Sequence, residues 1–230
     1  MVYSHFQEAK DPNLKKITLA AMFFAFLAGH VNAVLISLGA VSVSHLSGNV
    51  SHLGELALPG IRPQIQWAAA VLVSFLLGAF FSGYQLMDAK YASFRKYGVL
   101  MIVEGLALLM AAWLSSAHLM WTVALCAFGM GVQNAMVSSY KGLIIRTTHM
   151  TGIITDLGFL LGRLLKVKQW SQDKMFFLFS TLVAFFVGAC SGFWSALRFE
   201  FLSIYFCGGL CVLLGVLFYW QRVKHQASIR

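Results

Sequence analysis

The sequence contains six apolar stretches, each about as long as a helix that crosses a membrane. A transmembrane helix needs roughly 20 predominantly apolar residues. The stretches that meet this requirement are Ile17–Leu38, Trp67–Met87, Val99–Ser116, Trp121–Ser139, Met175–Leu197 and Phe199–Trp220. Hydrophobic residues make up 59% of the 230-residue chain and charged residues 11%, against about 25% charged in soluble domains. The chain is therefore predicted to be an all-α, polytopic membrane protein whose surroundings are the lipid bilayer.

Two further segments are apolar but interrupted by polar residues. Val41–Leu58 contains two histidines, an asparagine and several serines and glycines, and Thr147–Leu165 contains a histidine, an aspartate and an arginine. The loop charges decide whether these two segments cross the membrane. If neither crosses, one side carries four basic groups: Lys10, Lys15 and Lys16; Lys90, Arg95 and Lys96; Lys141, Arg146, Lys166, Lys168 and Lys174; and Arg222, Lys224 and Arg230.

The opposite side then carries only two arginines, Arg62 and Arg198. Because Lys and Arg accumulate in cytoplasmic loops, this distribution predicts six spans with both termini in the cytoplasm. The two interrupted segments are then re-entrant or half-helical. The net charge of +9 is explained by the same loops, so nucleic acid is not expected as a partner.

The two halves of the chain share short motifs in the same order. The matched motifs are Phe26–Ala33 with Phe128–Ala135, His45–Gly48 with His149–Gly152, and Leu72–Ala79 with Leu182–Ala189. A constant order at an offset of roughly 100–110 residues indicates an internal repeat. Since each half has three spans, the second half would enter the membrane from the opposite side, as in many transporters with a 3+3 inverted repeat. We expect repeats at 17–116 and 117–220, with cytoplasmic tails at 1–16 and 221–230.

The interrupted segments contain the residues expected at a functional site. Ser47-Gly48-Asn49 and Thr151-Gly152 resemble helix starts, because Ser and Thr are good N-caps and Gly permits close backbone approach. Two helix N-termini that converge from opposite sides would present amide donors, which bind anionic groups. We therefore expect a central site for a small solute, with an anion favoured. The residues expected to frame or line it are Asn32, Ser47, Gly48, Asn49, Gln133, Asn134, Thr151 and Gly152.

The same residues also fit a purely structural role, and both interpretations stay open. Small residues allow close helix packing, and buried amide side chains can bond to backbone carbonyls of neighbouring helices. Four titratable residues are candidates for carrying a proton or a charge: His45, Glu104, His149 and Asp156. Glu104 stands out because an ionisable group inside an apolar span is costly and is a functional candidate by default.

No catalytic or cofactor-binding pattern stands out in the sequence. The four cysteines lie in apolar runs without metal-type spacing, and there is no phosphate-binding Gly-rich loop or Ser/His/Asp order above background. His45 and His52, with Glu55 and His30, are a weak alternative metal site. We predict neither an enzyme nor a bound cofactor or metal.

These motifs resemble those of the YoaK-like family of bacterial membrane proteins, a domain of unknown function. The resemblance rests on Gly29-x-x-Asn32-Ala33, Ser47-Gly48-Asn49, Gly131-x-Gln133-Asn134-Ala135 and Thr151-Gly152, and it covers nearly the whole chain after the N-terminal tail. It implies a multi-pass protein of the bacterial inner membrane and no particular activity. The inverted repeat and the two interrupted segments, rather than the resemblance, favour a small-solute or ion transporter, and the limited surface of six spans is compatible with a homodimer. The alternative is a non-transporting scaffold or sensor.

Overall fold

All regular elements that the structure describes are helices. The computed structural model describes residues 14–57, 63–86, 94–138, 147–168 and 172–227. The long helices are α1 (Leu14–Ser37), α3 (Pro63–Leu86), α4 (Phe94–Leu114), α5 (Leu119–Ser138), α7 (Gln172–Phe199) and α8 (Ser203–Ala227). The shorter elements are α2 (Leu46–Leu53), α6 (Met150–Val167) and the 3-10 turns η2 (Gly54–Ala57) and η3 (Glu200–Leu202). The predicted all-α class is confirmed.

The long helices coincide with the predicted apolar stretches to within seven residues at either end. Five candidate membrane spans meet the length and composition of a crossing helix: Lys15–Ser37, Gln64–Leu86, Arg95–Leu114, Leu119–Val137 and Gln172–Trp220. The last has 49 residues and includes α7, η3 and α8 as far as Trp220. The chain turns between these two helices at Glu200, whose φ of 48° is left-handed. These helices are compatible with a multi-pass membrane protein.

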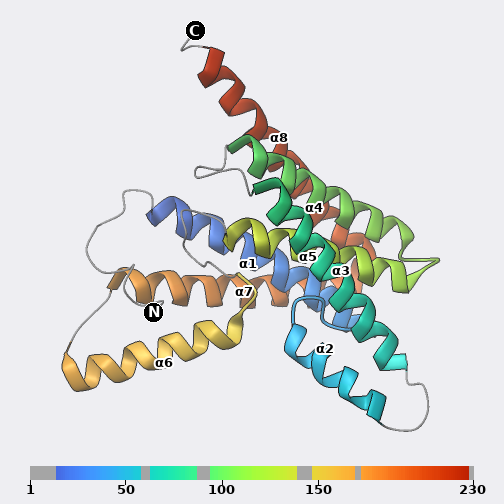
Figure 1. The fold of residues 1–230 in the computed structure, drawn as a ribbon, viewed down its shortest axis with the longest axis horizontal. Coiled ribbons are helices and arrows are strands. Elements are labelled where there is room, and N and C mark those ends of the chain that lie inside the picture. The colour runs from blue at the N-terminus through green and yellow to red at the C-terminus, as the bar shows by residue number, and fades with distance from the viewer. Residues whose placement is uncertain (1–13, 58–62, 87–93, 139–146, 169–171, 228–230) are drawn as a thin grey trace.

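The long helices pack in three pairs, and each pair joins one helix from each half of the sequence. The pairs are α1 with α7, α3 with α5, and α4 with α8 (Figure 1). Glycines allow the closest approaches. A methyl group on Gly29 would lie 2.2 Å from the carbonyl oxygen of Phe185, and one on Gly131 would lie 2.1 Å from that of Phe75. Only a residue without a side chain fits such contacts, as in other membrane bundles.

The contacts also give the direction of each pair. On α1 and α7, Gly188 lies against Phe26 and Gly192 against His30, so the two helices run the same way. Helices α3 and α5 also run the same way in Figure 1. On α4 and α8, in contrast, Gly98 lies against Gly215 and Gly105 against Gly208, so these two helices are antiparallel.

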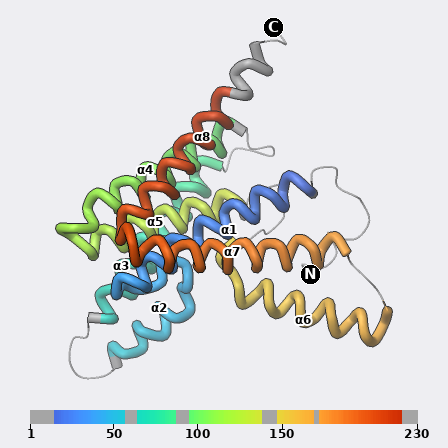
Figure 2. Tube along the Cα trace, turned by 180° about the vertical axis from the view of Figure 1, so that it is seen from behind, coloured from blue at the N-terminus to red at the C-terminus, as the bar shows by residue number. Residues whose placement is uncertain are grey.

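The two short helices begin near the middle of the molecule and run away from each other, as both views show (Figure 2). Helix α2 packs on α3 and α6 on α7. The expectation that Ser47 and Thr151 are the N-caps is wrong. The caps are His45 (φ −96°, ψ 70°) and His149 (φ −84°, ψ 65°), and neither side chain makes a capping hydrogen bond. The segment before each helix is held instead by a buried asparagine, so no side-chain cap is needed to place the start.

Candidate functional site

The asparagine of the first half, Asn32 on α1, holds the segment that leads into α2. Its Oδ1 accepts hydrogen bonds from the backbone N–H groups of Val43 (3.0 Å) and Ser44 (3.3 Å) and from the hydroxyl of Ser42 (3.2 Å). Its Nδ2 donates to the hydroxyl of Ser44. Asn32 is 7% exposed, so these bonds satisfy the polar groups of a buried amide. The side chain therefore fixes the position of the α2 start.

The second half repeats this arrangement with Asn134 on α5. The Oδ1 of Asn134 accepts a hydrogen bond from the Thr148 hydroxyl at 2.8 Å, just before α6. Its neighbour Gln133 donates from Nε2 to the Thr147 hydroxyl (3.2 Å) and to the Phe24 carbonyl of α1 (3.1 Å). Gln133 thus ties the α6 start to the other half of the chain. We call these two arrangements the asparagine clamps: Asn32 with residues 42–44, and Asn134 with Thr148.

Asn49, in the first turn of α2, also bonds within the protein. Its Nδ2 donates to the carbonyl oxygens of Ser42 (2.9 Å) and His45 (3.3 Å). All four amide side chains predicted at the site, those of Asn32, Asn49, Gln133 and Asn134, therefore bond within the protein. The Oε1 of Gln133, in contrast, is buried without a hydrogen-bond partner.

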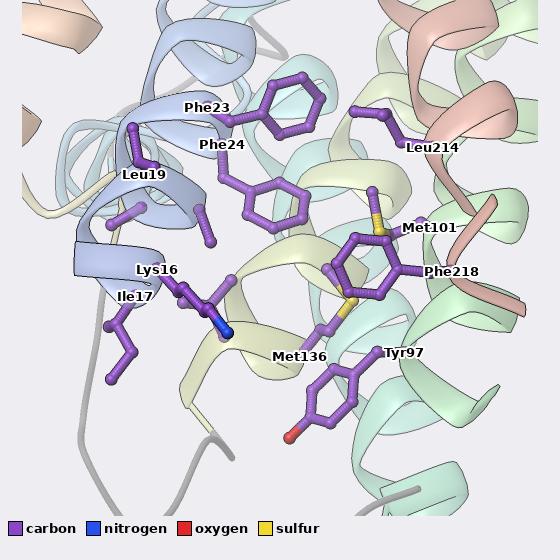
Figure 3. A pocket seen from close by; sticks show the side chains of 13 residues that line it. Lys16, Ile17, Leu19, Phe23, Phe24, Tyr97, Met101, Met136, Leu214 and Phe218 are labelled. Atoms are coloured by element: carbon purple, nitrogen blue, oxygen red, sulfur yellow. The ribbon is translucent and has the colours of Figure 1, made fainter. Parts of the chain in front are cut away.

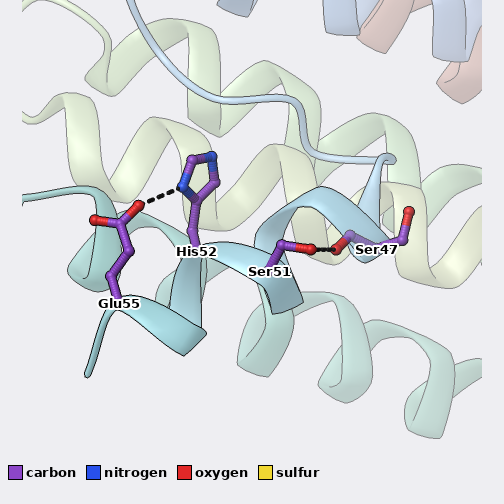
Figure 4. A network of polar contacts seen from close by, with 4 residues as sticks. All are labelled: Ser47, Ser51, His52 and Glu55. Atoms are coloured by element: carbon purple, nitrogen blue, oxygen red, sulfur yellow. Dashed lines mark hydrogen bonds and ion pairs between the residues drawn. The ribbon is translucent and has the colours of Figure 1, made fainter. Parts of the chain in front are cut away.

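The small polar residues of the short helices face outward. Ser47, Thr151 and Gly152 are exposed. The hydroxyl of Ser51 donates to the Ser47 carbonyl at 3.0 Å (Figure 4). The hydroxyl of Thr155 donates to the Thr151 carbonyl at 2.9 Å in the same way. The first turns of α2 and α6 thus present matched surfaces of small side chains and helix-start backbone.

The two glycines of the matched motifs differ in their surroundings. A methyl group on Gly48 would lie 2.5 Å from Cδ2 of the His45 ring, because this ring folds back over the helix start. A methyl group on Gly152 would meet nothing within 4 Å. His45 and His149 are both exposed, but only the His45 ring covers the glycine of its own helix start.

The histidines considered for a metal site have separate partners. His52 bonds through Nδ1 to Glu55 Oε1 at 2.9 Å (Figure 4). His30 is buried and lies 2.8 Å from the hydroxyl of Ser191 and 3.4 Å from that of Ser195, both on α7. Within the described part of the chain, no three His, Cys, Asp or Glu side chains form a group that could hold a metal ion.

Glu104 is fully buried and lies away from the short helices. Neither carboxyl oxygen accepts a hydrogen bond from an N–H or O–H group, and the thiol of Cys211 is the polar group beside it. Its side chain lies next to the backbone of Gly129 on α5 and near Cys207 and Cys211 on α8. Asp156, the other predicted acidic residue, is half-buried on α6. The predicted residues therefore fall into two places: the helix starts and the crossing of α4, α5 and α8.

Sequence reasoning missed the partners of the clamps. Ser42, Ser44, Thr147 and Thr148 lie just before the two matched histidines, and this position in the repeat was the available signal. The bonds of His30 to α7 were also missed, since its counterpart at the same offset is Val132 and the repeat marks nothing there.

A family model described as protein of unknown function (DUF1275) matches residues 20–217. The chain belongs to this family. The resemblance to the YoaK-like family is thereby confirmed, because the two are the same family. The DUF1275 match includes both asparagine clamps and both short helices. No curated protein and no solved structure matches the chain.

Proposed function

We propose that the protein transports a small solute or ion across the bacterial inner membrane, along a route that passes the starts of α2 and α6. The observation that carries this proposal is the matched construction of the two starts. Each follows a histidine in nearly the same backbone conformation, and each is positioned by a clamp, Asn32 or Asn134. Both begin near the middle of the molecule and run apart.

The helix pairing supports a 3+3 inverted repeat, with α1, α2, α3 and α4 equivalent to α5, α6, α7 and α8. If each helix is replaced by its equivalent in the other half, the α1–α7 pair becomes the α5–α3 pair, and the α4–α8 pair becomes the same pair again. The three main helix pairs of the structure are these three pairs. Three spans per half would make α1 parallel to α7 and α4 antiparallel to α8, as their glycine contacts require. In transporters built this way, solute sites lie near the middle of the bilayer where half-helices end.

The chemistry of the two starts favours an anionic solute. The first backbone N–H groups of a helix lack internal partners and carry partial positive charge. Non-helical backbone at membrane depth persists only within protein or beside a water-filled space. The exposed Ser47 and Thr151 hydroxyls beside these starts add hydrogen-bonding groups for a hydrated solute.

Charge coupling is assigned in this proposal to Glu104, with His45, His149 and Asp156 as secondary candidates. A charged carboxyl group in the middle of a span costs about 2.5–3.5 kcal/mol on insertion scales. Among the described residues no N–H or O–H group donates to Glu104, and only the weakly donating thiol of Cys211 lies beside it, so little offsets that cost, which supports a role for its proton. The homodimer stays a prediction.

Transport can be tested by uptake into liposomes that contain the full-length protein. Chloride, acetate and inorganic phosphate serve as the anion panel. Ser47→Trp and Thr151→Trp place bulk at the two starts, and Leu165→Trp on α6 is the control, because all three positions are exposed and tolerate a larger side chain. We expect flux of at least one anion, loss of that flux in both site variants, and normal flux in the control.

The alternative function is a scaffold or sensor that does not transport. It predicts no flux of any solute and unchanged liposome behaviour in all three variants. Binding of a protein partner under those conditions would replace the transport proposal with this one.

A further inference from the structure

An apolar cavity of about 560 Å³ lies between α1, α4, α5 and α8. Its walls come from the first turns of α1 and α4, the last turn of α5 and the second half of α8. The lining residues that matter most are Lys16, Phe24, Tyr97, Met136, Leu214 and Phe218. Drug-sized and lipid-like ligands occupy spaces of about 300–1,000 Å³.

The lining is apolar except at one end. Of the thirteen lining side chains, only those of Lys16 and Tyr97 carry polar atoms. Figure 3 shows the Lys16 ammonium and the Tyr97 hydroxyl toward the same end of the space, while Phe23 and Leu214 lie at the opposite end. The cavity thus has the polarity of an amphiphile: one cationic end and an apolar remainder.

The positive charge at this end belongs to Lys16. The nearby guanidinium of Arg95 bonds to the Tyr219 hydroxyl and lies 4.7 Å from the centre of the Tyr219 ring, so it is held on α8. Lys16 is exposed at the cavity mouth. Long basic side chains at helix ends reach toward lipid headgroups, and a nearby Lys attracts anionic lipid by about fivefold in affinity.

Packing requires that such a space be filled. The space is partly open, because Leu19 and Ala20 in its lining are exposed, so molecules that border the protein can enter it. Water is a poor occupant here, because a bound water needs two to four polar partners and this lining offers hardly any. An acyl chain from the neighbouring leaflet satisfies the apolar walls, and a phosphate group above it matches Lys16.

We propose that this cavity binds an anionic phospholipid, with one acyl chain between Phe24, Met136 and Phe218 and the phosphate at Lys16. This inference does not depend on the proposed transport. It would join the α1–α7 pair to the α4–α8 pair, which share few direct contacts among the described helices.

Photolabelling of the full-length protein tests the site. A phosphatidylglycerol with a diazirine in its acyl chain is added to the purified protein in detergent, and labelled peptides are mapped by mass spectrometry. We expect labels on Met101, Met136 or Phe218, and about fivefold stronger competition by unlabelled phosphatidylglycerol than by phosphatidylcholine with the same chains.

Two pairs of variants test separately the charge of Lys16 and the space in the cavity. Lys16→Gln should abolish the preference for phosphatidylglycerol, whereas Lys15→Gln, on the same exposed turn, should keep it. Ala20→Trp fills the cavity and should remove the labels, whereas Val73→Trp on the exposed face of α3 should leave them.

Three results would overturn the proposal. The first is labelling that Ala20→Trp does not change. The second is equal behaviour of Lys16→Gln and Lys15→Gln, which would indicate an apolar ligand without charge selection. The third is labelling that occurs only after removal of residues 1–13, which would mean that the protein's own N-terminal segment occupies the cavity.

Discussion

Gly78 on α3 and Phe128 on α5 are in direct contact through their backbones. A methyl group on Gly78 would lie 2.1 Å from the carbonyl oxygen of Phe128. The equivalent pair in the other half, Gly188 on α7 and Phe26 on α1, has the same separation of 2.1 Å. The two crossings are built alike, although their residues are far apart in the sequence.

The first prediction concerns this crossing. Gly78→Ala should lower the free energy of unfolding by about 1–3 kcal/mol, because the added methyl group meets backbone that cannot move independently. Gly83→Ala, on the same helix, meets nothing within 4 Å and should leave stability unchanged or raise it by about 0.5–1 kcal/mol. Thermal unfolding in detergent measures both. Equal effects of the two substitutions would contradict the close crossing.

The second prediction concerns the clamp at α2. Asn32→Leu removes an acceptor that serves three donors and leaves two backbone N–H groups without their partner. We expect a loss of about 2–3 kcal/mol, since each neutral hydrogen bond contributes about 1 kcal/mol and buried unpaired groups cost more. Ser47→Ala, whose hydroxyl is exposed, should cost little. A stable Asn32→Leu protein would show that the segment before α2 is held by other contacts.

The third prediction separates an inverted repeat from a repeat with one orientation. Ser51→Cys and Thr155→Cys are matched exposed positions on α2 and α6. In a background with the exposed Cys190 replaced by Ala, a membrane-impermeant maleimide should label Ser51→Cys from outside the cell. It should label Thr155→Cys only in inside-out vesicles. Labelling of both from one side rules out the inverted arrangement.

The fourth prediction concerns the buried carboxyl group. Glu104→Gln keeps the size of the side chain and removes its proton-carrying group, so anion uptake should lose its response to a pH gradient. The unfolding temperature should stay the same or rise, since no ionisable group is then buried at position 104. Glu55→Gln, on η2, is the control and should retain the response. Normal pH-driven uptake by Glu104→Gln would assign Glu104 a structural role.

The long helices could be predicted because the hydrocarbon core of a membrane requires apolar side chains along the whole length of each span. The stretch predicted at Trp121–Ser139 became α5 at Leu119–Ser138. The matched motifs also predicted which glycines and asparagines correspond. The repeat indicates that Asn32 and Asn134 have the same role, but it does not indicate which hydrogen bonds they make. Their partners lie in irregular segments whose path depends on tertiary contacts.

The helix starts were misplaced for a related reason. Capping preferences describe a helix by itself, whereas α2 and α6 are positioned from outside by side chains of α1 and α5. The cavity beside Lys16 could not be predicted at all, because its lining consists of ordinary apolar residues and arises only where four helices diverge.

The exchange of partners between the halves has a consequence for biosynthesis. When α1 and α3 leave the ribosome, the helices against which they will finally rest have not yet been made. Until α5 and α7 are synthesised, the glycine-containing faces of α1 and α3 lack the helices against which they pack in the finished protein. Assembly of this protein should therefore be completed late in translation, and a chain truncated before α7 should be a substrate for membrane proteases.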